Sequence, residues 1–216
     1  MSAPAALVFD FDGLLMDTES AALRAWQAEF EARGTHLPTD VWRSGVGRRD
    51  SHSILLAYLR EQIGSFDAEE VGKSWRARLD ASLETEGLRE GVRDYLDAAS
   101  RLGLRLAVAS SATADWVLGH LERVGVRHRF DVITCGDDHP PKPRPDIYLA
   151  TVAALGVRAG AAIAFEDSPP GVTSAKAAGL HCVAVPNPAT ATLTFEGADR
   201  IIASFTQLPS TLLISG

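Results

Sequence analysis

Cysteine, positive charge and long apolar runs are all scarce in this chain of 216 residues. Its two cysteines, Cys135 and Cys182, lie in strand-like apolar segments, so we expect reduced core residues in a cytoplasmic protein. No apolar stretch is long enough to span a bilayer, and acidic residues interrupt the first one, which predicts neither a membrane segment nor a signal peptide. The net charge of -7 argues against a nucleic-acid or anionic-membrane partner.

Nucleotide-binding and histidine-based metal motifs are also missing. No dinucleotide fingerprint or P-loop follows any strand-like run, so hydride transfer and ATP binding have no support. The six histidines are scattered and form no metal-ligand pair. His52, at the start of a predicted helix, is the one histidine that we single out for later inspection.

The hydrophobic pattern divides the chain into a helical block and a region where helices and strands alternate. Between residues 18 and 87 apolar residues recur at helical spacing, as in Leu23, Trp26 and Phe30, and Asp67 with Glu70 forms a capping-box pattern. From residue 91 short apolar runs alternate with helical patterns, which is typical of a parallel α/β sheet. The expected strands are 5–10, 104–109, 131–135, 161–165, 181–185 and 200–203.

Polar and charged residues follow several of these predicted strands. Asp10 and Asp12 follow the first strand, although aspartate is a poor strand residue and two like charges so close are costly. Because ligands bind beyond the carboxyl ends of parallel strands, all such residues should share one edge of the sheet. The other members of the set are Ser110, Ser111, Lys142, Glu166 and Asp167.

This combination of side chains suits phosphoryl transfer. Carboxylates at two strand ends can hold a hard cation such as Mg²⁺, and a carboxylate can attack phosphorus. Lys142 and Ser110 can hold phosphoryl oxygens, while a second carboxylate moves the proton. Taken singly, each residue also has an ordinary explanation. Ser110 could simply end a strand, Lys142 could be a surface lysine, and Glu166-Asp167 could cap a helix N-terminus. Their expected position at one edge of the sheet favours a functional site.

The same residues resemble the motifs of a known superfamily. Asp10-Phe11-Asp12-Gly13, Ser110, Lys142 and Glu166-Asp167-Ser168 match, in order, the four motifs of the haloacid dehalogenase (HAD) superfamily. Flanking residues resemble its β-phosphoglucomutase-like subfamily over nearly the whole chain. The resemblance implies a Rossmann-like parallel-sheet core over 1–15 and 88–216, with an inserted α-helical cap over 16–87.

Residue roles come from this resemblance. It implies that Asp10 is the nucleophile and a Mg²⁺ ligand, and that Asp12 is the general acid/base whose backbone carbonyl also binds the metal. Asp167 would be the third protein ligand, supported by Glu166. Ser110, with Ser111 beside it, and Lys142 would bind the phosphoryl group, while Arg48 in a cap loop would bind a distal phosphate. Arg48 equally fits a solvated loop.

The resemblance leaves two phosphoryl acceptors open, water and a second sugar hydroxyl. Mutases of the subfamily carry a histidine where this chain has Ala22, and a Ser-Lys-Asn run where it has Ala112-Thr113-Ala114. These departures favour a phosphatase for a small sugar phosphate or nucleotide-related monophosphate, with a β-phosphoglucomutase-type mutase second. A receiver-like phospho-aspartate signalling module fits less well, because it is shorter and has no inserted cap. Trp26 and Trp75 are expected in the core of the cap, and the oligomeric state is left open.

Overall fold

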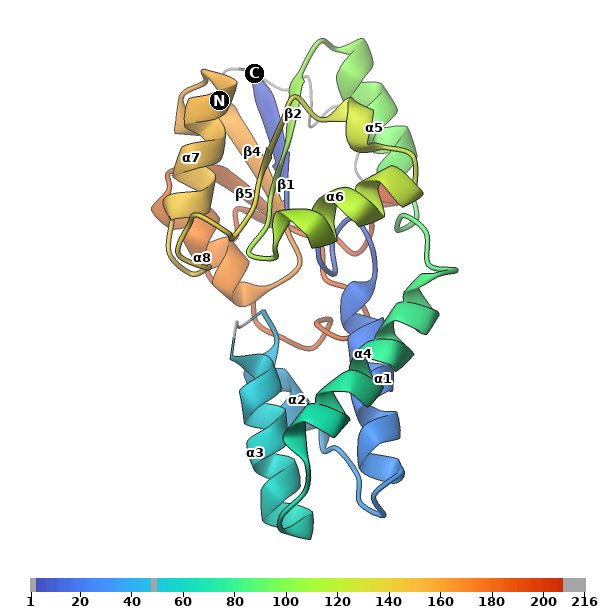
Figure 1. The fold of residues 1–216 in the computed structure, drawn as a ribbon. Coiled ribbons are helices and arrows are strands. Elements are labelled where there is room, and N and C mark those ends of the chain that lie inside the picture. The colour runs from blue at the N-terminus through green and yellow to red at the C-terminus, as the bar shows by residue number, and fades with distance from the viewer. Residues whose placement is uncertain (1–2, 48–49, 208–216) are drawn as a thin grey trace.

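A parallel sheet forms the centre of the computed structural model, which describes residues 3–47 and 50–207. The six strands in this part of the chain are all parallel and are ordered β3-β2-β1-β4-β5-β6 (Figure 1). The predicted parallel α/β fold is therefore confirmed. Its strands are β1 (Ala6–Phe9), β2 (Arg105–Ala109), β3 (Val132–Thr134), β4 (Ala162–Glu166), β5 (His181–Ala184) and β6 (Arg200–Ile201).

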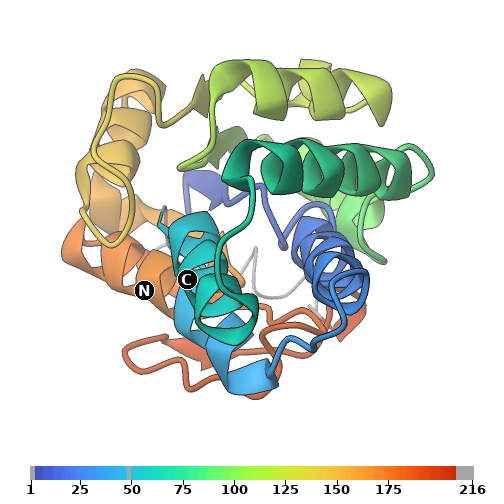
Figure 2. The same cartoon turned by 60° about the horizontal axis from the view of Figure 1, so that its bottom comes forward.

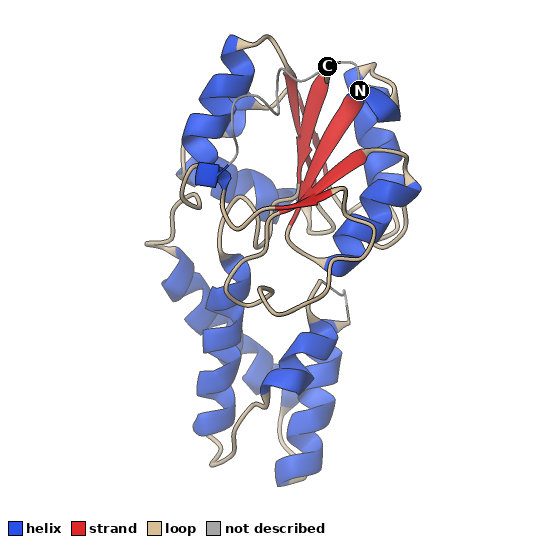
Figure 3. Ribbon diagram, turned by 180° about the vertical axis from the view of Figure 1, so that it is seen from behind, coloured by secondary structure: helices blue, strands red, loops and turns tan. Residues whose placement is uncertain are grey.

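Helices cover both faces of the sheet (Figure 3), which explains why the central strands are apolar along their whole length. Leu7 and Phe9 pack in one hydrophobic cluster with residues of α5 (Val92–Arg101) and α6 (Ala114–Arg123). Ala6 and Val8 pack on the other face with residues of α7 (Asp146–Leu155) and α8 (Pro169–Ala177). The sheet is thus held rigidly between two apolar layers, and its carboxyl ends open at one edge.

Beyond that edge lie the helices that the chain inserts after β1 (Figures 1 and 2). The side chain of Asp17 caps the first helix by accepting a hydrogen bond from the Ser20 amide. Asp67 accepts hydrogen bonds from the amides of Glu69 and Glu70, as its capping pattern predicts. In the described part of this block the helices are α1 (Thr18–Glu31), α2 (Thr39–Gly45), α3 (Ser51–Ile63) and α4 (Ala68–Leu83).

These inserted helices have a core of their own. Trp26, Phe30 and Leu59 are buried in one hydrophobic cluster of this block. Buried Glu29 of α1 accepts hydrogen bonds from the Ser74 hydroxyl and the Arg78 guanidinium of α4, each at 2.6 Å. The arrangement suits a separate cap, while the boundaries 16–87 and 1–15 with 88–216 stay a prediction.

Several details differ from the sequence-based expectations. The last strand spans Arg200–Ile201 rather than 200–203. Both cysteines are free, but only Cys182 lies in the core, since Cys135 follows β3 at the sheet edge and is half-buried. In the described ranges, no helix is long and apolar enough to cross a membrane. Short 3-10 turns complete the fold at Arg127–Arg129, Ala159–Ala161 and Phe205–Gln207.

Candidate active site

The carboxyl edge of the sheet brings together predicted site residues from four separate segments. Asp10 follows β1, Ser110 follows β2, Lys142 lies in the loop after β3, and Glu166 and Asp167 lie at the end of β4. All five are buried, with at most 7% of any of them exposed. Their convergence follows from the parallel strands, because each strand delivers its next residue to the same edge.

Lys142 is the central cation of this edge. Its Nζ atom donates hydrogen bonds to Asp10 Oδ1 at 2.7 Å, Glu166 Oε1 at 2.6 Å and the Ala109 carbonyl at 2.9 Å. Burial alone would lower the pKa of Lys142, but the two carboxylates raise it above its ordinary value. All three ammonium protons have acceptors within the protein, so its phosphoryl-binding role stays a prediction. The Tyr148 hydroxyl donates to Glu166 Oε1 as well, at 2.5 Å.

Three buried carboxylates lie close together here, and two of them, Asp10 and Glu166, bind the Lys142 ammonium. One oxygen each of Asp10, Glu166 and Asp167 lies within 4.8 Å of the others. Burial, followed by the charge of Asp10, raises the pKa of Glu166 to about 7 and raises that of Asp167 well above its ordinary value. Glu166 Oε2 is buried, and no described residue hydrogen-bonds it. An excess of buried, oxygen-only acceptors fits a hard divalent cation such as Mg²⁺.

Asp12 lies outside that carboxylate cluster and has its own partners. The Thr18 hydroxyl and the Trp116 indole N–H both donate to Asp12 Oδ1, each at 2.9 Å. The Gly13 amide in turn donates to the Thr18 hydroxyl at 2.9 Å. Burial and then the charge of Asp10 raise the pKa of Asp12 to about 6, against the effect of its two donors. Asp12 can therefore carry a proton near neutral pH, as a general acid must.

The two serines after β2 have different surroundings. Ser110 is buried, and its hydroxyl accepts a hydrogen bond from the Ala112 amide at 3.1 Å. The Ser111 hydroxyl accepts from the Lys142 amide at 3.1 Å. Ser111 therefore anchors the loop that carries the lysine, and the phosphate-binding role predicted for both serines stays a prediction.

Sequence reasoning missed two residues that hold the acidic turn in place. Arg89 donates hydrogen bonds to the carbonyls of Gly13 at 2.8 Å, Val185 at 3.0 Å and Pro186 at 2.7 Å. Asn187 donates to the Gly13 carbonyl at 3.2 Å and to Asp167 Oδ2 at 2.7 Å. Asn187 follows β5, so the rule of strand ends applies to it too. No comparable sequence pattern pointed to Arg89.

A cavity of about 820 Å³ lies over this edge and extends to the inserted helices. Asp10, Asp12, Ser110 and Lys142 line its sheet side. Trp26 and Trp75 line its helical side, where they also pack against His52 with ring centroids 4.8 and 5.1 Å apart. Both tryptophans thus belong to the packed interior of the block, as expected, and also border the cavity.

Two other predicted contacts of the helical side have different outcomes. Ala22 lines the cavity and offers it no polar group. Arg48 lies outside the described residues, so its predicted contact with a distal phosphate stays a prediction. Glu19 lines the cavity too, and burial, with the charge of Asp12 next, raises its pKa to about 8.

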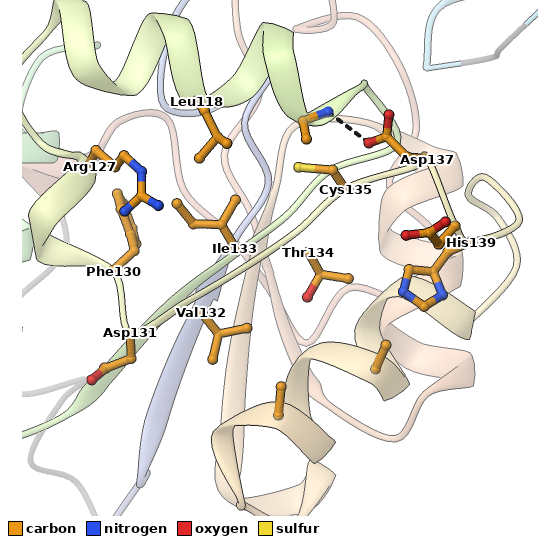
Figure 4. A pocket seen from close by; sticks show the side chains of 14 residues that line it. Leu118, Arg127, Phe130, Asp131, Val132, Ile133, Thr134, Cys135, Asp137 and His139 are labelled. Carbon is orange, nitrogen blue, oxygen red and sulfur yellow. Dashed lines mark hydrogen bonds between the residues drawn. The ribbon is translucent and has the colours of Figure 1, made fainter.

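A second cavity, of about 520 Å³, runs along the outer edge of β3 (Figure 4). It is bordered by Ile133, Cys135 and Asp137, and none of the carboxylates at the sheet's carboxyl edge reaches it. Asp137 accepts a hydrogen bond from the Ala114 amide at 2.7 Å, so its carboxylate is used to hold the start of α6. The first cavity is therefore the candidate active site.

Comparison with known proteins identifies the family. The family model described as haloacid dehalogenase-like hydrolase matches residues 7–185, and the chain belongs to this family of enzymes. The chain is 42% identical over 211 residues to the "Putative phosphatase YhcW" of Bacillus subtilis (strain 168), covering 97% of this chain and 96% of that protein. The family expected from the four motifs is thus confirmed.

Two further similarities involve proteins named for sugar substrates or ligands. A phosphorylated carbohydrates phosphatase of Thermotoga maritima is 33% identical over 179 residues, or 82% of each chain. A crystal structure of CbbY from Rhodobacter sphaeroides in complex with xylulose-(1,5)bisphosphate is 32% identical, with a TM-score of 0.76. The match to that structure covers 95% of this chain and 96% of that one.

Proposed function

We propose that this enzyme is a Mg²⁺-dependent phosphatase that hydrolyses a small phosphorylated sugar through a phospho-aspartate on Asp10. The observation that carries the proposal is the buried set of three carboxylates, two of them bound to the Lys142 ammonium, beside a cavity of about 820 Å³ that Asp10, Asp167 and Lys142 line. The phosphorylated carbohydrates phosphatase and the sugar bisphosphate bound to CbbY favour a sugar phosphate over a nucleotide-related monophosphate.

The metal would be held by Asp10, Asp167 and the backbone carbonyl of Asp12, with Glu166 supporting this set. When bound, Mg²⁺ offsets the negative charge of the phosphoryl oxygens and of the carboxylates that surround them. Lys142 and Ser110 would hold the phosphoryl group from the other side. Lys142 also keeps Asp10 aligned through its 2.7 Å hydrogen bond.

In the first step, the Asp10 carboxylate attacks phosphorus and forms an acyl-phosphate bond. The bond between phosphorus and the ester oxygen breaks, and Asp12 gives its proton to that oxygen, so the sugar leaves as an alcohol. In the second step, Asp12 takes a proton from a water that attacks phosphorus. The acyl-phosphate bond then breaks, which releases inorganic phosphate and restores Asp10 as a carboxylate and Asp12 as an acid.

Transfer to water is favoured over transfer to a second sugar hydroxyl by the cavity lining. Ala22 and Ala112 line the cavity at positions where the sugar mutases carry polar side chains, so this chain has fewer groups to hold a bisphosphate intermediate. A β-phosphoglucomutase-type reaction is the second candidate, and a receiver-like signalling module would have no use for a cavity of this size.

The test is a panel of phosphomonoesters with the purified enzyme and MgCl₂. The panel contains pentose and hexose phosphates, hexitol phosphates, nucleoside monophosphates, and β-glucose 1-phosphate with a bisphosphate primer. We expect phosphate release from sugar or hexitol phosphates, and none from the Asp10→Asn variant, which keeps the shape of the side chain. Isomerised glucose phosphate without phosphate release would identify a mutase, and turnover by Asp10→Asn would refute the nucleophile assignment.

A further inference from the structure

The orientation of Asp12 depends on two donors from different parts of the molecule. Thr18 begins α1 of the inserted helices, and Trp116 lies on α6 beside the sheet. Both donate to Oδ1, and no residue in the described ranges hydrogen-bonds Oδ2. Under the proposed function, Oδ2 is therefore the oxygen that carries the proton to the leaving group and takes it back from water.

The Trp116 ring is itself held by the inserted helix α4. The guanidinium carbon of Arg76 lies 5.2 Å from the centroid of the Trp116 ring and 5.4 Å from that of Trp75. Trp116 also packs against the apolar cluster that contains Leu79 and Leu83 of α4. The side chains of α4 therefore reach the indole of α6 from the side of the helical block.

The indole thus connects two parts of the protein at one point. Its N–H reaches Asp12, which is 104 positions away in the sequence, while its ring contacts a cation of the inserted helices. The ring also contacts His120 of the same helix, with 4.3 Å between the ring centroids and 75° between the ring planes. The contacts with Arg76 and His120 hold the ring in the orientation that directs its N–H at Asp12 Oδ1.

We propose that Trp116 is a positioning residue through which Arg76 of α4 fixes the orientation of the Asp12 carboxylate. The inference rests on the proposed function, since it assigns Asp12 the transfer of the proton. The help that Asp12 gives as acid and base then reaches its full value only while the side chains of α4 lie against Trp116. Arg76 acts on the reaction through the indole, without touching the phosphoryl group.

Dependence on the leaving group separates this role from a merely structural one. An alkyl phosphate needs a proton on its departing oxygen, whereas p-nitrophenyl phosphate has a stable leaving group that needs little acid help. We expect Trp116→Phe, which keeps a ring for Arg76 and removes the N–H, to lower kcat/KM for an alkyl sugar phosphate about 10-fold. The loss for p-nitrophenyl phosphate should be less than about threefold.

A double-mutant cycle tests the connection to Arg76. Arg76→Met keeps the aliphatic stem and removes the cation, and it should lower kcat for the alkyl substrate roughly threefold with little change in KM. In the Trp116→Phe background the same change should have no further effect, because the N–H that it positions is gone. Arg76→Lys keeps a cation over the ring and should restore most of the lost rate.

Arg78→Met provides the matched control. It removes a guanidinium from the same helix, but one that pairs with Glu29 away from the cavity. We expect it to lower the unfolding temperature while leaving kcat within about twofold of wild type. The melting temperature of each variant shows that the compared proteins are folded.

Three results would overturn the inference. They are equal losses for the alkyl and the aryl ester in Trp116→Phe, additive effects of Trp116→Phe and Arg76→Met, and a rise in KM as the main effect of Arg76→Met. The last would make Arg76 a direct substrate contact. If Trp116→Phe does not fold, the inference is tested by comparing Arg76→Met with Arg76→Lys on the alkyl and the aryl ester. Equal losses for the two esters in Arg76→Met, or no recovery in Arg76→Lys, would then overturn it. A wild-type enzyme that releases no phosphate would refute the proposed function instead.

Discussion

Replacing Asp167 by asparagine should make the metal-free protein more stable, although it removes a residue of the site. Asp167 is 2% exposed, and one of its oxygens lies within 4.8 Å of carboxylate oxygens of Asp10 and Glu166. Each such pair repels by roughly 3 kcal/mol at an effective dielectric constant of about 20. Lys142 offsets part of this sum, so about 3 kcal/mol of repulsion should be relieved by Asp167→Asn. The amide oxygen can still accept the hydrogen bond from Asn187.

The effect should depend on pH in a defined direction. The folded protein raises the pKa of Asp167 well above 3.8, so the folded state holds a proton that the unfolded state releases. Below about pH 4 Asp167 is protonated in both states and costs no stability. As the pH rises from there toward the pKa of the folded state, the free energy of unfolding falls. Because Asp167 can take up a proton instead of staying charged, the loss of unfolding free energy cannot exceed about 1.4 kcal/mol for each pH unit above 3.8. This upper limit is about 5 kcal/mol at pH 7.5. The advantage of Asp167→Asn should therefore be near zero at pH 4 and grow with pH.

Thermal unfolding in EDTA and in excess MgCl₂ measures both parts of this reasoning. For a chain of this length, about 3 kcal/mol corresponds to an increase of roughly 6–12 °C in Tm at pH 7.5 in EDTA. Wild type should regain about 2.7 kcal/mol when Mg²⁺ is at about 100 times its Kd, while the variant gains little. A variant that melts below wild type in EDTA at pH 7.5, or an equal response of both proteins to Mg²⁺, would refute the reasoning.

Three further changes probe the same site. Asp12→Ala should slow hydrolysis about 10²–10⁴-fold and let phospho-Asp10 accumulate, which intact-mass spectrometry after acid quenching would detect; wild-type turnover would contradict the acid/base role. Lys142→Met leaves Asp10 and Glu166 without their ammonium and should cost about 3–5 kcal/mol in urea unfolding without metal, whereas an unchanged midpoint would mean that the carboxylates simply take up protons. Gly171→Ala places a methyl group against the Glu166 carboxylate and should cost about 1–3 kcal/mol in the same assay, with an unchanged midpoint showing that Glu166 can move aside.

The sheet and its functional edge were predictable because they follow from local patterns. Continuous apolar runs such as Ala6–Phe9 are typical of strands covered on both faces, and helices do cover both faces here. Once the strands are parallel, Asp10, Ser110 and Asp167 must reach one edge. Lys142 is different, because physics alone allows a surface lysine, and only the family motif pointed to its buried position.

The residues that the sequence did not reveal act through contacts between distant segments. Trp116 has the appearance of an ordinary apolar residue on an amphipathic helix, and nothing near it in the chain indicates a bond to Asp12. Tyr148 likewise fits the apolar face of α7 until its hydroxyl is seen at Glu166. Arg89 binds three carbonyls that come from two separate loops. Such donors are visible only when the packing of the elements is known.

The contacts of the acidic pair explain how neighbouring aspartates can take different roles. Asp10 shares a buried ammonium with Glu166, at 2.7 Å from its own Oδ1, and belongs to the carboxylate set suited to a divalent cation. Among the described residues, the hydrogen-bond donors to Asp12 are both neutral, a hydroxyl and an indole N–H, and both bind the same oxygen. Cations favour a charged nucleophile, whereas neutral donors on one oxygen leave the other able to gain and lose a proton. The division of roles that we propose for Asp10 and Asp12 therefore rests on their partners, which come from the loop after β3, from α1 and from α6 rather than from the motif itself.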